Sequence, residues 1–271
     1  MALAELPEQI TTVEALEELL TRPRPELIEF IKTLRSPLVL LGAGGKLGPT
    51  LAELARRAAL AAHHPLTIVA VSRFSNPAPR RWLEARGIAT IACDLLEREQ
   101  LKQLPDTENL IYMVGLKFGT RQNPCATWAA NTLAPAHVAE RYPQSRMVVL
   151  STGNVYPLVP ANGSGATEDQ PLTPLGEYAN TAVARERIFE YFADQHGFPC
   201  VLLRLNYAVE LRYGVLLDIA QKVHAGHPVD VAMGYFNCLW QGDANERVLR
   251  ALGLARHPPL ALNLTGLEKI S

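Results

Sequence analysis

The sequence has few cysteines, almost no net charge and no long apolar run, and each shortage argues against a class of protein. Four cysteines occur in 271 residues, widely scattered and without a CxxC pair, so we expect reduced thiols in a cytoplasmic protein and no metal site or disulfide framework. The net charge of −1 gives no general attraction to nucleic acid or to an anionic membrane. A run of about 18 apolar residues, which a membrane-spanning helix needs, is not found.

From residue 36 the sequence alternates between apolar runs and helical segments. The predicted strands are the runs PLVLLGAGG, LTIVAVSR, IATIACD, NLIYMVG, RMVVLST and PCVLLRLN. Each run is almost continuously apolar, so the strands are expected to be parallel and to be covered by helices on both faces. The sequence therefore predicts an α/β protein with a doubly wound parallel sheet, the Rossmann fold.

Two segments flank this alternating pattern. Residues 1–35 are predicted to form an N-terminal helical extension, in which Thr12 caps the helix VEALEELL. Residues 36–205 form the predicted nucleotide-binding domain. Beyond this the pattern loosens around one helix near VLLDIAQKVHAG, so residues 206–271 are predicted to form a small C-terminal cap region that binds the substrate.

The segment GAGGKLG follows the first predicted strand and opens the first long helix. Its glycines Gly42, Gly45 and Gly48 have the spacing GxxGxxG. In a dinucleotide-binding turn, the first glycine permits the tight turn, the second lets the backbone approach a pyrophosphate, and the third lets the helix pack closely on the strand. The N–H groups at the start of the helix would bind the phosphates. We predict a dinucleotide site here, which also includes Lys46 and Leu47.

The end of the second predicted strand indicates which dinucleotide is bound. NAD sites usually place a carboxylate at this point to bind the ribose 2′-hydroxyl, whereas NADP sites use arginine for the 2′-phosphate. This sequence has Ser72 and Arg73 and no adjacent acid. A guanidinium pairs with phosphate through charge-assisted hydrogen bonds. The sequence therefore favours NADP over NAD.

Together with further short motifs, these features resemble the extended short-chain dehydrogenases/reductases of the NAD(P)-dependent epimerase/dehydratase family. The resemblance runs from about residue 37 to the C-terminus and rests on GAGGKLG, Asp94-Leu95, Asn131, LSTGNVY, Tyr178, LLRLN and QGDAN. It implies that Asp94 and Leu95 lie beside the adenine and that Val114 also contacts the cofactor. It also implies a homodimer formed through the helices that carry Asn131 and Tyr178.

The resemblance assigns the catalytic hydroxyl groups to Thr152 and Tyr178. Thr152 lies four residues before Tyr156 in LSTGNVY, the position of the family's catalytic serine or threonine. In family members that dehydrate nucleotide sugars, an acidic pair follows this residue. Gly153 and Asn154 occupy those positions here, which argues against 4,6-dehydratase chemistry.

The family's lysine, four residues after the tyrosine, is replaced by Ala182. In the family that lysine binds the nicotinamide ribose, and its charge lowers the pKa of the tyrosine. Three accounts remain open. Lys117 or Arg185 could supply a substitute cation, Tyr178 could act as a neutral acid, or the fold could sense NADP(H) without catalysis.

The sequence thus favours an NADP-dependent oxidoreductase acting on a small polar hydroxy or keto compound, such as a sugar derivative. An NAD(P)-dependent sugar epimerase and a non-catalytic NADP(H)-binding sensor are the alternatives. The residues predicted to contact the substrate are Lys117, Asn154, Asn206 and Arg212. The expected partners are this small molecule and a second copy of the chain, with no nucleic acid and no membrane.

Overall fold

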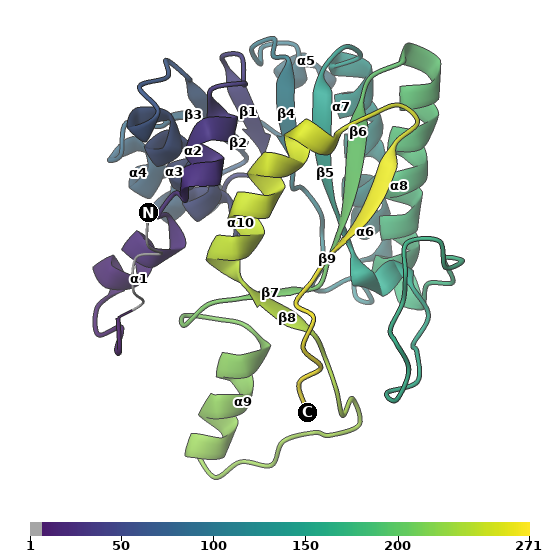
Figure 1. Cartoon of the computed structure of the whole chain (residues 1–271). Helices are drawn as coiled ribbons and strands as arrows, with labels where there is room; N and C mark the ends of the chain where they lie inside the picture. The colour runs from purple at the N-terminus through teal and green to yellow at the C-terminus, as the bar shows by residue number, and fades with distance from the viewer. Residues whose placement is uncertain (1–6) are drawn as a thin grey trace.

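The computed structural model describes residues 7–271, so residues 1–6 of the predicted N-terminal extension lie outside its described part. At its centre is a seven-stranded sheet in the order β3-β2-β1-β4-β5-β6-β9, in which all neighbouring strands are parallel (Figure 1). The strands are β1 (Leu38–Leu41), β2 (Ile68–Ser72), β3 (Ala89–Ala92), β4 (Asn109–Tyr112), β5 (Arg146–Thr152), β6 (Cys200–Leu205) and β9 (Leu260–Leu264).

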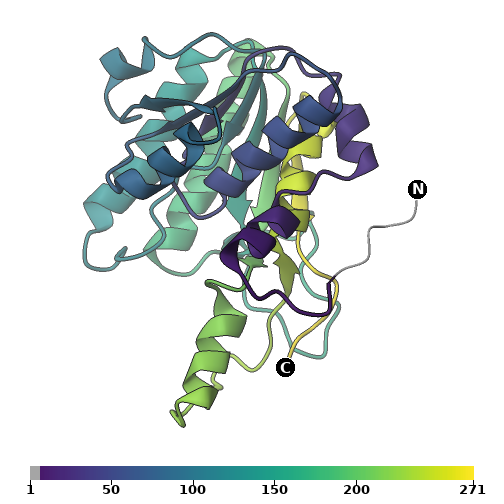
Figure 2. The ribbon, with the colours of Figure 1, turned by 90° about the vertical axis from the view of Figure 1, so that its left-hand side faces the viewer.

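Helices cover both faces of this sheet (Figures 1 and 2). The helices are α1 (Val13–Leu20), α2 (Pro25–Ile31), α3 (Gly48–Ala61), α4 (Pro77–Glu84), α5 (Arg98–Leu101), α6 (Pro124–Trp128), α7 (Ala134–Arg141), α8 (Gly176–His196), α9 (Val215–His224) and α10 (Gln241–Arg250), with short helical turns η1 (Ala129–Leu133), η2 (Gly153–Val155) and η3 (Ala251–Leu254).

The alternation of side chains along each strand produces two separate cores. In β1, Leu38 and Leu40 pack with residues of α2, α3, α4 and α10, whereas Val39 and Leu41 pack with residues of α5, α7 and α8. All four are completely buried, which explains why the run is apolar at every position instead of every second one. The predicted doubly wound parallel sheet is confirmed.

The N-terminal extension packs on the first core, against α3 and α10. Leu27 and Ile31 of α2 are fully buried there. The predicted cap of the first helix is present, because Thr12 Oγ1 accepts a hydrogen bond from the backbone N–H of Ala15 over 3.1 Å. The extension thus covers a face of the sheet domain.

The predicted C-terminal region divides into two parts. β9 pairs with β6 at the edge of the large sheet, and α10 packs on α3, so both belong to the layers of the Rossmann domain. Strands β7 (Tyr207–Val209) and β8 (Cys238–Trp240) form a separate small sheet, with α9 projecting beyond it (Figures 1 and 2). The sequence did not reveal β9 because most of this edge strand is only partly buried and lacks a long apolar run.

The helix predicted around ATWAANTLAPAHVAERY is present, but it contains a π-helical turn, η1, between α6 and α7. Such turns are rare and are often found at functional sites. No helix within residues 7–271 is long and apolar enough to cross a membrane.

Candidate functional site

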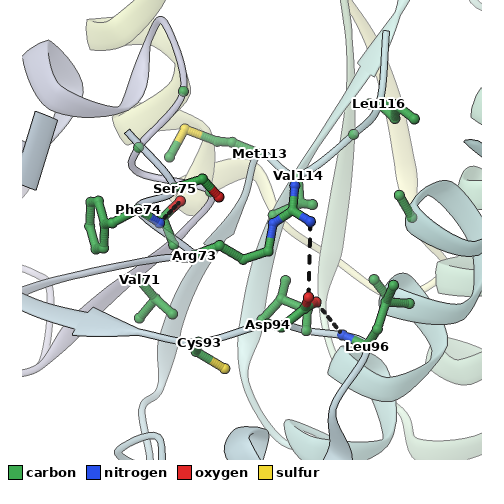
Figure 3. A pocket seen from close by; sticks show the side chains of 18 of the residues that line it. Val71, Arg73, Phe74, Ser75, Cys93, Asp94, Leu96, Met113, Val114 and Leu116 are labelled. Atoms are coloured by element: carbon green, nitrogen blue, oxygen red, sulfur yellow. Dashed lines mark hydrogen bonds and ion pairs between the residues drawn. The ribbon is translucent and has the colours of Figure 1, made fainter. Parts of the chain in front are cut away.

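A cavity lies where the strand order of the sheet reverses, at the carboxyl ends of β1, β2 and β4 (Figure 3). Open α/β sheets bind their ligands at this point, because the loops leave β1 and β4 in opposite directions. The cavity measures about 310 Å³. The lining residues come from the glycine turn, the ends of β2, β3 and β4, and the long helix: Gly42, Gly44, Gly45, Val71, Ser72, Arg73, Phe74, Ser75, Asn76, Cys93, Asp94, Leu95, Leu96, Met113, Val114, Gly115, Leu116, Ala130 and Ala134.

The three motif glycines have different surroundings. Gly42 has φ +93°, and a Cβ there would lie 3.0 Å from the backbone of Met113 and Val114. A Cβ on Gly48 would lie 2.4 Å from the carbonyl oxygen of Ala43, inside the contact between helix and turn. Around Gly45, only the Gly42 carbonyl oxygen comes within 4 Å, at 3.3 Å, so this side of the turn is open to a ligand.

The first turn of α3 offers backbone N–H groups to an anion, although its second residue, Pro49, contributes none. No side chain caps this 14-residue helix at its N-terminus, and the first N–H groups of a helix have no partner within the helix. These groups and the partial positive charge of the helix end suit a phosphate. Of the predicted residues of this turn, Gly42 and Gly45 line the cavity. Lys46, Leu47 and Gly48 do not, and Leu47 packs on the core instead.

At the other end of the cavity, Arg73 and Asp94 face each other (Figure 3). Arg73 Nη1 lies 3.9 Å from Asp94 Oδ2, and the arginine side chain is 65% exposed. An exposed pair at this distance contributes little, so the guanidinium can turn to a stronger anion. Asp94 is fixed by its own contacts, since its Oδ1 accepts from the Leu96 N–H and its N–H donates to Gln100 Oε1. The predicted residues Ser72, Leu95 and Val114 also line this cavity.

The cavity holds one thiol, that of Cys93. Burial, with a smaller contribution from the charge of Asp94, raises the pKa of Cys93 to about 11. The group therefore stays protonated near neutral pH and is a poor nucleophile. Within residues 7–271, no group of three or more histidine, cysteine, aspartate or glutamate side chains is placed to hold a metal ion.

The two predicted catalytic residues lie outside this cavity. Thr152 is the last residue of β5 and is 8% exposed, and Tyr178 lies half-buried in the first turn of α8. α8 packs against β5 and η2, so both residues belong to one packing unit beside the carboxyl ends of the strands. Thr152 Oγ1 accepts a hydrogen bond from the Asn154 N–H over 3.3 Å.

The long helix and the loop after β4 are joined by the side chain of Asn131, which lies in the π-helical turn. Its Oδ1 accepts from the Leu116 N–H over 2.8 Å, and its Nδ2 donates to the Leu116 carbonyl over 3.1 Å and to Thr181 Oγ1 over 2.8 Å. Arg185 donates to the same Oδ1 over 3.0 Å. This completely buried amide therefore fixes the loop that forms one wall of the cavity.

The two predicted substitutes for the lysine, Arg185 and Lys117, make contacts with groups other than Tyr178. Ala182 is fully buried, and its methyl group is part of the packed interior. Arg185 is 4% exposed and donates to two neutral acceptors, Leu150 O and Asn131 Oδ1. Lys117 directs its ammonium group over the rings of Phe118 and Tyr207, 5.6 Å from each centroid.

The residues predicted to contact substrate lie in different places. Asn154 is exposed on η2. Asn206 donates to Thr265 Oγ1 over 2.8 Å, and its Oδ1 lies so close to Gly153 that a Cβ there would clash at 2.1 Å. Arg212 does not join them, because its guanidinium pairs with Glu210 and with Glu17 of α1. We therefore leave Arg212 out of the candidate site.

Several contacts of the site were not predicted from the sequence. Phe74, Met113 and Leu116 line the cavity. Their positions just after β2 and β4 could have indicated this in the sequence, since the loops that follow these strands bind ligands in this fold. Tyr213 donates to the Lys46 carbonyl over 3.2 Å, linking the cap region to the glycine turn. No local sequence motif predicts a contact between residues so far apart in sequence.

Comparison with known proteins identifies one family. The sequence model of the NAD dependent epimerase/dehydratase family matches residues 38–235, which is most of the chain. A search among curated proteins finds no match.

Solved structures share the fold at low sequence identity. A crystal structure of UDP-galactose 4-epimerase superposes with a TM-score of 0.69 at 20% identity, covering 87% of this chain and 79% of that one. UDP-glucuronic acid 4-epimerase from Bacillus cereus, in complex with NAD, gives 0.69 at 17% identity, covering 87% and 80%. An epimerase from Methanothermobacter thermautotrophicus gives 0.74 at 16% identity, covering 91% and 76%. At these identities the similarity establishes the fold alone.

Proposed function

The chain belongs to the NAD dependent epimerase/dehydratase family, and from this premise we propose that it is an NADP(H)-dependent oxidoreductase that reduces the carbonyl group of a small polar compound. The cavity at the switch point of the sheet, with Arg73 at its edge, is the observation that carries the proposal. A bound NADPH would supply the hydride. The glycine turn and the free N–H groups of α3 would hold its pyrophosphate.

Arg73 would select NADP over NAD. Its guanidinium is mostly exposed and only loosely paired with Asp94, so a 2′-phosphate can take it over through shorter charge-assisted hydrogen bonds. The family description names NAD. The proposed preference for the phosphorylated dinucleotide rests instead on Arg73, which directly follows β2.

Tyr178 would donate the proton as a neutral phenol, with Thr152 orienting the substrate oxygen. The replacement of the lysine by the buried Ala182 removes the family's cation from the position four residues after Tyr178, and the buried Arg185 donates instead to Leu150 O and Asn131 Oδ1. Reduction needs a proton donor, and a protonated phenol is one. This supports reduction, not oxidation, as the favoured direction.

Cofactor selection can be tested by measuring NADP+ and NAD+ affinities by calorimetry. Arg73→Ala is expected to weaken NADP+ binding by about tenfold to a hundredfold, the range for hydrogen bonds to charged groups, and to leave NAD+ binding within about threefold. Arg81→Ala, on the exposed side of nearby α4, removes the same charge and is the control. Equal losses for both dinucleotides would refute the role of Arg73.

Catalysis can be tested by following the nicotinamide absorbance while NADPH and a panel of hydroxy-carbonyl compounds are offered. Tyr178→Phe is expected to reduce turnover by about a hundredfold or more, whereas Tyr191→Phe, exposed on the same helix, should not. Tight NADP(H) binding with no turnover of any compound would favour a sensor instead.

A sugar epimerase is the second candidate, because several structures that share the fold are nucleotide-sugar epimerases. An epimerase would interconvert its substrate without net consumption of cofactor. Product formation at constant nicotinamide absorbance would therefore identify it.

A further inference from the structure

Two lysines stand together beside the cavity without a carboxylate partner. Lys46 belongs to the glycine turn and Lys117 to the loop after β4. Their ammonium groups lie 5.7 Å and 5.6 Å from the centroid of one ring, that of Phe118. Within residues 7–271, the lysines that form ion pairs are Lys32 and Lys102.

The neighbours of both lysines are aromatic rings and not acids. Lys46 Nζ lies 4.3 Å from the centroid of Tyr213, and Lys117 Nζ lies 5.6 Å from that of Tyr207. Exposed cation–π contacts stabilise a cation only weakly. The two like charges also act on each other: burial by the surrounding protein, and then the charge of Lys46, lower the pKa of Lys117. A dianion between them would remove this repulsion.

The direction of the two side chains separates them from the cofactor groove. Gly45 and Leu116, each next to one of the lysines in sequence, line the cavity, but the lysines do not. The rings they approach, Tyr207 and Tyr213, come from the cap region, the first from β7 and the second from the loop before α9. Both ammonium groups therefore face the cap, on the side where a substrate would lie.

We propose that Lys46 and Lys117 form a binding site for an anionic oxygen group of the substrate, a phosphoryl or carboxylate group. The exposed rings of Phe118 and Tyr207, 70% and 47% exposed, flank this site and would pack on the carbon skeleton next to the anion. The proposal rests on the proposed function for the presence of a substrate, and it narrows the substrate to an anionic hydroxy or keto compound.

The experiment uses inorganic phosphate as the probe, titrated by calorimetry into the full chain saturated with NADP+. Saturation fills the groove, so a phosphate that still binds does not occupy the pyrophosphate position of the cofactor. Lys46→Met and Lys117→Met are each expected to weaken phosphate binding by about tenfold to a hundredfold and to leave NADP+ affinity within about threefold. Lys222→Met, which removes the same charge from the exposed α9, is the control and should match the unaltered chain.

Each other outcome overturns the proposal. The proposal is wrong if phosphate does not bind to the NADP+-loaded chain. It is also wrong if Lys222→Met weakens phosphate binding as much as the other two substitutions do, because this would indicate general charge attraction. Weaker NADP+ binding with unchanged phosphate binding would assign the lysines to the cofactor. If NADP+ itself does not bind, the proposed function fails, and the same phosphate titration of the cofactor-free chain and its three variants then decides the anion site by itself.

Discussion

Removing the charge of Arg204 is expected to destabilise the fold strongly, because it would leave a buried carboxylate alone. Arg204 of β6 and Glu186 of α8 form an ion pair with a 2.8 Å contact, and their side chains are 5% and 0% exposed. Burial by itself would lower the pKa of Arg204, but the hydrogen bonds and charge of Glu186 outweigh it, so that this pKa lies above its ordinary value. Ser151 also donates to Glu186, and Arg204 donates to the Tyr156 hydroxyl over 2.8 Å.

The size of the effect follows from this burial. Breaking a buried pair from one side costs about 3–5 kcal/mol, mostly the cost of the charge left behind. Arg204→Met should therefore lower the free energy of unfolding by about 4 kcal/mol. If the free energy of unfolding falls by about 3 kcal/mol per molar urea, the urea concentration at the unfolding midpoint would decrease by about 1.3 M. In the double variant Arg204→Met/Glu186→Gln the loss should be smaller than the sum of the two single losses.

Urea unfolding followed by circular dichroism measures these differences. Arg187→Met is the matched control, since Arg187 lies on α8 next to Glu186 and pairs with Glu190, while its side chain is 60% exposed. Exposed pairs of this kind contribute about 0–1 kcal/mol. If Arg204→Met cost no more than Arg187→Met, or if the two single losses simply added, the reasoning from burial would be wrong.

Two further predictions concern the wall of the cavity and the proposed anion site. Gly115→Ala would place a Cβ 2.5 Å from Arg185 Nη2, and this overpacking should lower the free energy of unfolding by about 1–3 kcal/mol. Thermal unfolding measures the effect, with Gly234→Ala as the control because the nearest atom to its Cβ would be 3.8 Å away. Equal losses of stability in the two variants would contradict the prediction. The pKa of Lys117 is lowered from its ordinary value of 10.5, so its ammonium form is present at low pH and is lost at a lower pH than that of an ordinary lysine. Phosphate affinity, measured by calorimetry at a series of pH values, should therefore begin to decline below pH 10.5. Lys117→Arg, whose guanidinium stays charged, should remove this early decline.

The sheet domain could be predicted from the sequence because its strands are buried on both faces. Strands such as LVLL are apolar at every position, and the glycine turn identifies which strand comes first. The edge strand at Leu260–Leu264 was not predicted, since four of its five residues are only partly buried. Local patterns reveal burial, and this strand has little of it.

The candidate site was predictable only where a short motif carries it. Gly42, Gly45, Arg73 and Asp94 were predicted to lie in one site from their positions after the strands, and all four line one cavity. Arg212 was predicted to contact substrate, but it pairs with Glu17, a residue 195 positions away in sequence. Partners that meet through tertiary packing leave no sequence spacing to recognise, so polarity alone could not separate Arg212 from ligand-binding residues.

The carboxylate of Glu17 has a consequence for how the protein can be trimmed. It accepts hydrogen bonds from Trp82 of α4, from Arg86 just after α4 and from Arg212 of the cap region. The family match nevertheless begins only at residue 38. A recombinant fragment cut to that match would lose the acceptor for three donors and uncover the apolar flanks of α3 and α10. The first helix therefore belongs in any version of this chain made for biochemistry, with affinity tags attached ahead of it and not in its place.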